Sequence, residues 1–226
     1  MSEFSVIIPT LQRAKELHEL VEMCAAHPRV LEVLVINNAP EPLAWESPKV
    51  RVLQQAENIY VNPAWNLGAR EARGDYLAIL NDDIEMEPAV FDAVARILRR
   101  GWFSMVGPAA SCMVSEGGRI RHRPGSLRTE PFGTAMFLRK ADYAPIPESM
   151  RIWGGDDWLI YNQARPIAKL VGARFRTDMS VTSASPEFAE MRRREYQEYL
   201  RVCRPLLRRK AWHWPASLMA RVSSPA

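Results

Sequence analysis

The sequence predicts an α/β fold in which a mostly parallel central sheet is covered by helices on both faces. Short apolar runs alternate along the chain with segments whose apolar residues recur at helical spacing. One run, residues 76–80, is almost wholly apolar, as expected of a strand that is buried on both faces of a parallel sheet. The 226 residues, 47% of them hydrophobic and 25% charged, favour one well-buried domain over two.

The first half of the chain alternates strands and helices. Strands are expected at residues 4–9, 33–36 and 50–53, each a short run rich in β-branched or other apolar residues. A first helix is expected around residues 17–24, where apolar residues recur at helical spacing. Because strand and helix alternate in this way, the strands are expected to be parallel and the helices to pack on the sheet.

The stretch 58–87 is the centre of the predicted site. Pro63 suits the first turn of a helix, and Gly74 with Asp75 ends it before the apolar strand at 76–80. Asn81, Asp82 and Asp83 then follow directly. In an open α/β sheet the carboxyl ends of the strands form the ligand crevice, so we expect these polar residues to face a substrate.

The second half of the chain is expected to contain a helix at 90–98, strands from 104 and at 132–138, and edge strands at 173–177 and 179–182. Residues 115–131 are rich in glycine and arginine and predict a mobile basic loop, either a lid over phosphate or acceptor or a solvated loop. Residues 153–159 read WGGDDWL, which predicts a helix that carries two carboxylates at its amino end. A charged helix at 187–200 follows.

Composition and charge narrow the class further. The three cysteines are far apart and the amino-terminal residues lack the pattern of a signal peptide, so a cytoplasmic protein with reduced thiols is expected. Residues 165–226 contain 13 basic and 5 acidic residues, a net charge of +8, whereas residues 1–164 have a net charge of −4. Such asymmetry indicates either an anionic partner, nucleic acid or a membrane surface in peripheral contact, or a solvated helix face.

The motifs in their order resemble the family 2 glycosyltransferases of the GT-A fold, a Rossmann-type three-layer α/β/α sandwich. The resemblance rests on Asn58, Asn66 with Gly68, the run Ala72-Arg73-Gly74-Asp75-Tyr76, the triplet Asn81–Asp83 and the acidic pair in WGGDDWL. It covers roughly residues 4–185. It implies a glycosyltransferase domain at 1–185 and a basic helical extension at 186–226 packed on the same domain.

The resemblance also implies roles for individual residues. Asp83 would hold a divalent cation, manganese or magnesium, and Asp157 would be the catalytic base, with Asp156 as its neighbour or substitute. Donor-binding residues would be Pro9, Thr10, Arg13, Asn38, Asn58, Asn66 and Asp82, and acceptor-binding residues Gly133, Thr134, Trp158 and Arg123. The chain departs from the family pattern at Asn81, at Asn37 or Asn38, and at Ser183 or Ser185, where the family usually has acidic residues or a histidine.

We therefore expect a metal-dependent, inverting transfer of a sugar from a nucleotide-sugar donor, a UDP-sugar being favoured, to an acceptor hydroxyl. The acceptor would be a glycan or a lipid-linked glycan, or a hydroxymethylated pyrimidine in DNA. A nucleotidyltransferase is an alternative, but the segment after the first strand lacks the glycine-rich stretch such enzymes usually carry. A catalytically silent binding module is another, although Asp82, Asp83, Asp156 and Asp157 are all retained.

Overall fold

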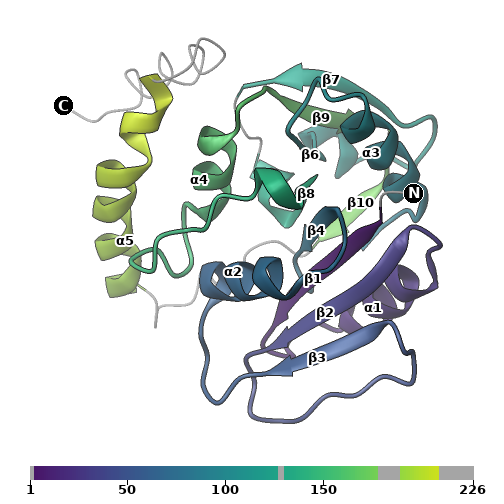
Figure 1. Cartoon of the computed structure of the whole chain (residues 1–226), viewed down its shortest axis with the longest axis horizontal. Helices are drawn as coiled ribbons and strands as arrows, with labels where there is room; N and C mark the ends of the chain where they lie inside the picture. The colour runs from purple at the N-terminus through teal and green to yellow at the C-terminus, as the bar shows by residue number, and fades with distance from the viewer. Residues whose placement is uncertain (1–2, 127–129, 178–188, 209–226) are drawn as a thin grey trace.

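An eight-stranded sheet forms the centre of the computed structural model, which describes residues 3–126, 130–177 and 189–208 (Figure 1). Its strands lie in the order β3-β2-β1-β4-β8-β6-β9-β7. In chain order they are β1 (Phe4–Thr10), β2 (Val30–Asn37), β3 (Val50–Gln54), β4 (Tyr76–Leu80), β6 (Met105–Pro108), β7 (Arg121–Gly125), β8 (Ala135–Arg139) and β9 (Ile167–Val171). Two short strands, β5 (Ile84–Met86) and β10 (Phe175–Thr177), form a separate antiparallel pair.

Strand directions confirm the expected mostly parallel sheet. The strands β3, β2, β1 and β4 are parallel neighbours, and β9 is parallel to β6. Only β8, which lies between β4 and β6, and the edge strand β7 run in the opposite direction. The carboxyl ends of β1, β2 and β4 therefore meet at one edge of the sheet, where a ligand crevice is expected.

Helices cover both faces of the sheet because successive strand residues point to opposite sides. On β1, Val6 and Ile8 belong to one hydrophobic core and Ile7 to the other. The helices α1 (Leu17–Ala26) and α3 (Ala89–Arg99) contribute to the first core, and α2 (Val61–Glu71) and α4 (Gly155–Asn162) to the second. A further helix, α5 (Ala189–Val202), lies beside α4 (Figure 1). Within the described ranges, no helix is both long and apolar enough to cross a membrane.

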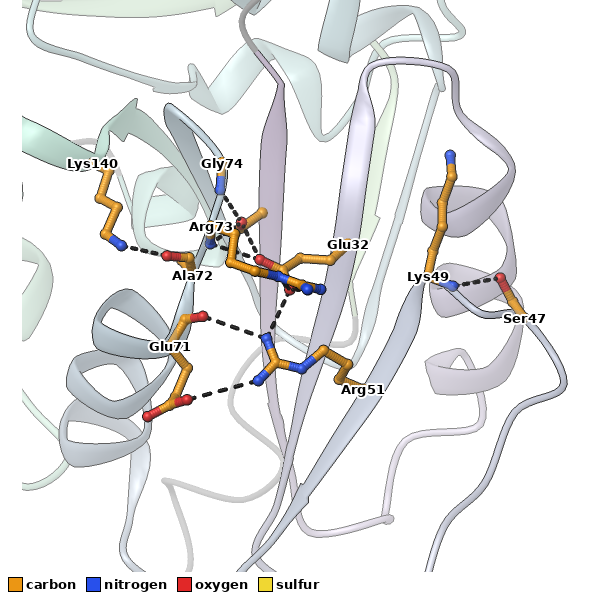
Figure 2. A network of polar contacts seen from close by, with 10 residues as sticks. Glu32, Ser47, Lys49, Arg51, Glu71, Ala72, Arg73, Gly74 and Lys140 are labelled. Atoms are coloured by element: carbon orange, nitrogen blue, oxygen red, sulfur yellow. Dashed lines mark hydrogen bonds and ion pairs between the residues drawn. The ribbon is translucent and has the colours of Figure 1, made fainter.

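A buried ionic network holds the amino-terminal edge of the sheet (Figure 2). Glu32 on β2 is fully buried and accepts hydrogen bonds from Ser5 Oγ at 2.8 Å, Arg51 Nη1 at 2.8 Å and the Arg73 backbone N–H at 2.7 Å. Burial alone would raise the pKa of Glu32, but the hydrogen bonds from Arg73, Arg51 and Ser5 outweigh it and lower this pKa to about 2. The carboxylate thus joins β1, β2, β3 and the turn before β4.

Most expected elements are confirmed, but one predicted loop is wrong and one strand begins later than expected. The strands at 4–9, 33–36, 50–53 and 76–80 correspond to β1 to β4, and the helix expected from Pro63 is α2, which begins at Val61. The prediction of a loop throughout 115–131 is wrong, because residues 121–125 form β7, which pairs with β9, a strand that was not predicted. The strand expected at 132–138 begins only at Ala135. The expected strand at 179–182 falls outside the part of the chain that the structure describes.

Candidate active site

The ends of β1 and β4 bring the first predicted pair together. Thr10, the last residue of β1, is buried, and its Oγ1 donates a hydrogen bond to Asp82 Oδ2 at 2.6 Å. The same oxygen accepts a hydrogen bond from the backbone N–H of Gln12, which has a left-handed conformation with φ +58°. Pro9 is buried in β1, and Arg13 is exposed three residues after its end. The expected neighbours Thr10 and Asp82 are thus in contact.

Asn37 and Asn38 at the end of β2 have different roles. The Asn37 amide is buried and fully used: Nδ2 donates to Glu41 O and Gln54 Oε1, both at 2.7 Å, and Oδ1 accepts from Gln12 Nε2 at 3.1 Å. Asn38 accepts a single hydrogen bond, from the Ile59 backbone N–H at 3.2 Å. Of the two, Asn38 therefore has the side chain better placed to contact a ligand at this edge.

Two asparagines of α2 tether the segment that leads to the second acidic motif. Asn66 Nδ2 donates to Ile146 O at 2.8 Å, while its Oδ1 accepts from Tyr143 Oη at 2.8 Å and from the Ile146 N–H at 2.9 Å. Asn62 Nδ2 donates to Met150 O at 3.1 Å. Asn58, predicted with Asn66 to bind donor, accepts a hydrogen bond from the Tyr60 N–H at 2.8 Å in the turn before α2. The Asn66 amide is thus committed to structural contacts.

The glycines of WGGDDWL are required by two different geometries. Gly154 has φ +74°, a left-handed backbone conformation that residues other than glycine rarely adopt. Gly155 begins α4, and a Cβ added there would lie too close to Asn62 Oδ1, so that a side chain at Gly155 would overlap the Asn62 amide. The two glycines let the chain turn sharply against α2 and place Asp156 and Asp157 in the first turn of α4.

The two acidic motifs meet at the same edge of the sheet. Thr134, directly before β8, accepts a hydrogen bond at its carbonyl from the Asn81 N–H at 2.9 Å. At the neighbouring Gly133, an added Cβ would lie only 2.8 Å from Asp156 Oδ2. Gly133 and Thr134 therefore connect the backbone of Asn81 to the side chain of Asp156, although the motifs are separated by more than 70 positions in the sequence.

Asp156 and Asp157 have different surroundings. Asp156 is half-buried, and its Oδ1 accepts a hydrogen bond from the Asp157 N–H at 2.9 Å. Asp157 is 5% exposed, and its carboxylate lies near the phenols of Tyr161 on α4 and Tyr199 on α5. Burial, followed by the charge of Asp157, raises the pKa of both phenols, so both hydroxyls stay protonated and can donate.

Negative charge accumulates beside the end of β4. Burial, together with the neighbouring charge of Asp83 and against the opposing hydrogen bond from Thr10, raises the pKa of Asp82 to about 6. Among residues 3–126, 130–177 and 189–208, no cluster of three metal-binding side chains occurs. Two adjacent carboxylates nevertheless fit a hard divalent cation that completes its coordination with diphosphate oxygens and water. Ser183 and Ser185 lie beyond the described ranges.

The predicted acceptor residues do not all reach this edge. Gly133 and Thr134 lie there, in the short helix η2 (Glu130–Thr134), and the Thr134 hydroxyl donates to Pro131 O at 2.7 Å. Trp158 on α4 is half-buried and donates from Nε1 to Pro145 O at 3.1 Å. Arg123 lies on the edge strand β7, four strands from β4 in the sheet order, and is not brought to the acidic residues.

Three residues that contact the acidic motif were not predicted as part of the site. Tyr161 has a sequence signal, because it is four positions after Asp157 and therefore lies on the same face of α4. Tyr199 and Glu195 lie about 40 residues further along the chain, on α5. Glu195 is buried and accepts hydrogen bonds from the backbone N–H groups of residues 151–153. No local pattern in the sequence indicates either contact.

Comparisons with known proteins place the chain among glycosyltransferases. The sequence model described as glycosyl transferase family 2 matches residues 5–150. No curated protein matches the chain significantly in a sequence search. Among solved structures, the fold is similar to S. aureus TarS 1–349 with a TM-score of 0.66 at 16% identity over 92% of this chain. GalNAc-T7 solved with UDP, GalNAc and Mn2+ gives a TM-score of 0.62 at 13% identity over 98% of this chain.

These likenesses show the GT-A fold. A TarS 1–349 structure in complex with UDP-GlcNAc matches with a TM-score of 0.58 at 16% identity, over 96% of this chain and 79% of that chain. The present chain spans 66% of the TarS 1–349 chain first compared and 55% of GalNAc-T7. The matched range 5–150 contains the Asn81–Asp83 triplet but not Asp156 and Asp157.

Proposed function

This chain belongs to glycosyl transferase family 2, and we propose that it transfers a sugar from a nucleotide-sugar donor to an acceptor hydroxyl. The observation that carries the proposal is the meeting of the two acidic motifs across Gly133 and Thr134. A glycosyl transfer needs positive charge at the leaving diphosphate and a base at the incoming hydroxyl within one sugar's reach. This edge of the sheet has residues suited to both tasks.

Donor binding is proposed at the ends of β1, β2 and β4. Asn38 would contact the nucleotide base, and Thr10 would orient Asp82 through the 2.6 Å hydrogen bond. A UDP donor is favoured because the structures of TarS and GalNAc-T7 named above were solved with UDP or UDP-GlcNAc. Asp83, with Asp82, would hold a divalent cation, whose chemistry when bound is to neutralise charge that develops on the leaving diphosphate.

Asp157 is the proposed base and Asp156 its substitute. The acceptor oxygen would attack the anomeric carbon on the face opposite the diphosphate, with its proton passing to the carboxylate. The bond between the anomeric carbon and the diphosphate oxygen breaks, the nucleoside diphosphate leaves, and the configuration at that carbon is inverted. The phenols of Tyr161 and Tyr199 lie near this carboxylate and would help to orient it. Asp156 is the more exposed of the two acids and lies against Gly133. Asp156 would therefore be the better placed base if the acceptor enters from the side of β8.

The proposal is tested first by ligand-dependent stability. Purified protein is heated with UDP, UDP-GlcNAc and a panel of other nucleotide sugars, each with and without MnCl2, and UDP release is measured in parallel. Because a ligand that binds only the native state raises its stability, at least one UDP compound is expected to raise the melting temperature, more so with manganese. If no nucleotide or nucleotide sugar stabilises the protein or is turned over, the proposed function is wrong.

The acceptor is proposed to be a glycan or lipid-linked glycan, with a hydroxymethylated pyrimidine in DNA as a second candidate. The observation that favours DNA as an acceptor is that Arg192, Arg193 and Arg194 are exposed on α5, the helix whose Tyr199 lies near Asp157. Arg208, Arg209 and Lys210 were expected to contribute as well, but the structure describes no side chain for them. DNA as the acceptor also requires the target base to be extruded from the duplex.

Salt dependence and product mass separate the two acceptors. Binding of duplex DNA through several phosphates should weaken with a log–log slope of roughly −0.9 per contact. Mass spectrometry of DNA containing 5-hydroxymethyl pyrimidines should then reveal an added hexose or pentose. If donor turnover proceeds while the DNA stays unlabelled, the glycan acceptor is the better account. Binding to anionic vesicles without DNA binding would instead assign the arginines to a membrane surface.

A further inference from the structure

A buried carboxylate on α5 binds the backbone that leads into the second acidic motif. Glu195 is 1% exposed, and its two carboxylate oxygens accept hydrogen bonds from the N–H groups of Arg151 at 3.0 Å, Ile152 at 2.9 Å and Trp153 at 3.0 Å. Three consecutive amides converging on one anion form a concave binding arrangement. Hydrogen bonds to a charged acceptor are roughly twice as strong as neutral ones, so this contact orders the three residues.

The same segment is held from its other side by α2. Asn62 Nδ2 donates to Met150 O at 3.1 Å, and the Asn62 backbone N–H donates to Arg151 O at 2.9 Å. Carbonyls of the segment are thus bound by α2, while its amides are bound by Glu195 of α5. The backbone immediately before Gly154, whose left-handed conformation starts the turn into α4, is restrained in both directions.

Tyr199 extends the contact to the acidic pair itself. It is four residues after Glu195 and therefore on the same face of α5. Its ring packs on Gly154, where an added Cβ would lie 2.8 Å from Tyr199 Cδ2, and its phenol lies near enough to Asp157 for that carboxylate to raise the pKa of Tyr199. Two adjacent turns of α5 thus contact the backbone before the motif and a carboxylate within it.

We propose that Glu195 is a positioning residue for the Asp156–Asp157 pair, acting together with Tyr199, so that α5 is part of the catalytic apparatus. The inference rests on the proposed glycosyl transfer. Like the acidic pair that it positions, Glu195 lies beyond residues 5–150, the range that matches the family. A displacement of a catalytic group by about 1 Å can cost about a hundredfold in rate, which is why a clamp on residues 151–153 bears on turnover.

A purely structural role predicts a different pattern of losses. If Glu195 only stabilised the fold, its removal would lower the melting temperature without changing the turnover of molecules that remain folded. If it positions the acids, turnover should fall while UDP affinity is kept, because the proposed donor contacts at Thr10, Asn38 and Asp82 lie on other elements. Separate measurements of kcat and of UDP affinity therefore distinguish the positioning role from a purely structural one.

The test compares Glu195→Gln with Glu198→Gln as a matched control. Glu198 is on the same helix and bonds Ser149 Oγ at 2.6 Å and Arg201 Nε at 2.8 Å, neither of which is a backbone amide of 151–153. Full-length proteins are compared by hydrogen–deuterium exchange of the peptide that contains 151–153, by UDP affinity with Mn2+, and by the kcat of UDP release from the nucleotide sugar that the wild type turns over most rapidly.

In Glu195→Gln, the amide group places an N–H donor where the carboxylate accepted, so faster exchange in 151–153 is expected. The kcat should fall by about tenfold to a hundredfold with UDP affinity within about twofold of wild type, whereas Glu198→Gln should resemble wild type in all three readouts. Unchanged kcat in Glu195→Gln, an equal loss in Glu198→Gln, or a parallel loss of UDP affinity would each overturn the inference.

Tyr199→Phe decides the case if Glu195→Gln fails to fold. This variant removes one hydroxyl and keeps the ring on Gly154, so its melting temperature should stay near that of wild type while kcat falls at least about threefold and UDP affinity is kept. A kcat equal to wild type would contradict the positioning role. Wild-type protein that neither binds UDP nor releases it from any nucleotide sugar would instead mark failure of the proposed function, while the exchange measurement would still report on the clamp.

Discussion

Replacing Glu32 by glutamine should destabilise the protein at neutral pH without affecting donor binding. Glu32 is fully buried at the amino-terminal edge of the sheet, opposite the candidate site, and its carboxylate bonds Ser5, Arg51 and Arg73 (Figure 2). Glutamine has a similar shape but one acceptor oxygen and no charge, so it cannot satisfy the donors that converge there.

The magnitude follows from the pKa of Glu32, which the fold lowers from 4.5 to about 2. At about 1.4 kcal/mol per pKa unit, this shift corresponds to about 3 kcal/mol of folding free energy at neutral pH. The side chains of Arg51 and Arg73 are 33% and 62% exposed, so solvent screening weakens both ion pairs. We therefore expect Glu32→Gln to lower the free energy of unfolding by about 2 kcal/mol.

The pH dependence gives the prediction its sign. Because the pKa of Glu32 is lower in the folded than in the unfolded state, its contribution is complete above pH 4.5 and is lost as the pH falls toward 2. The free-energy difference between wild type and Glu32→Gln, measured by urea unfolding with tryptophan fluorescence, should therefore narrow between these values. Glu198→Gln is the control, because the partner Arg201 is 71% exposed and the expected loss is much smaller.

Two results would refute this reasoning. If the difference in unfolding free energy between wild type and Glu32→Gln stays constant from about pH 7 to about pH 3, the loss of stability arises from packing and not from the charge. An equal loss in Glu198→Gln would show that burial of the carboxylate does not decide the magnitude. UDP affinity serves as the internal check that the carboxyl-terminal edge of the sheet is unchanged.

Three further predictions concern the candidate site. Asp83→Asn should abolish manganese-dependent stabilisation by UDP and reduce turnover to near background, while the melting temperature of the ligand-free protein stays unchanged. Asp82→Asn should reduce turnover less. Full activity in excess chelator would contradict a metal at these residues. Asp157→Asn should lower the kcat of transfer by about a hundredfold or more with little change in UDP affinity, and a loss confined to UDP affinity would exclude it as the base. Gly155→Ala should lower both stability and kcat, since the added methyl group overlaps the Asn62 amide, and circular-dichroism melting beside UDP release tests whether the two losses occur together.

Much of the fold was predictable because burial leaves a local pattern. Each strand from β1 to β4 is a short run of mainly apolar residues, and the alternation with helices indicates parallel connections. The strand β7 was missed for a physical reason, whereas β9 does carry a local signal, because Ile167–Val171 is a short and mainly apolar run. Residues 121–125 are largely exposed and include arginine, proline and glycine, so only pairing with the backbone of β9 makes them a strand. Such pairing depends on a partner about 45 residues away.

Local patterns predicted the fold class and located the two acidic motifs, because strand patterns and turn residues act over a few neighbouring positions. Only the tertiary structure brought Asp156 to the edge where Asn81, Asp82 and Asp83 end β4. It alone also brought Glu195 into reach of residues 151–153. The partners of Glu195 are backbone amides, which every residue except proline carries, so no side-chain pattern could have indicated them.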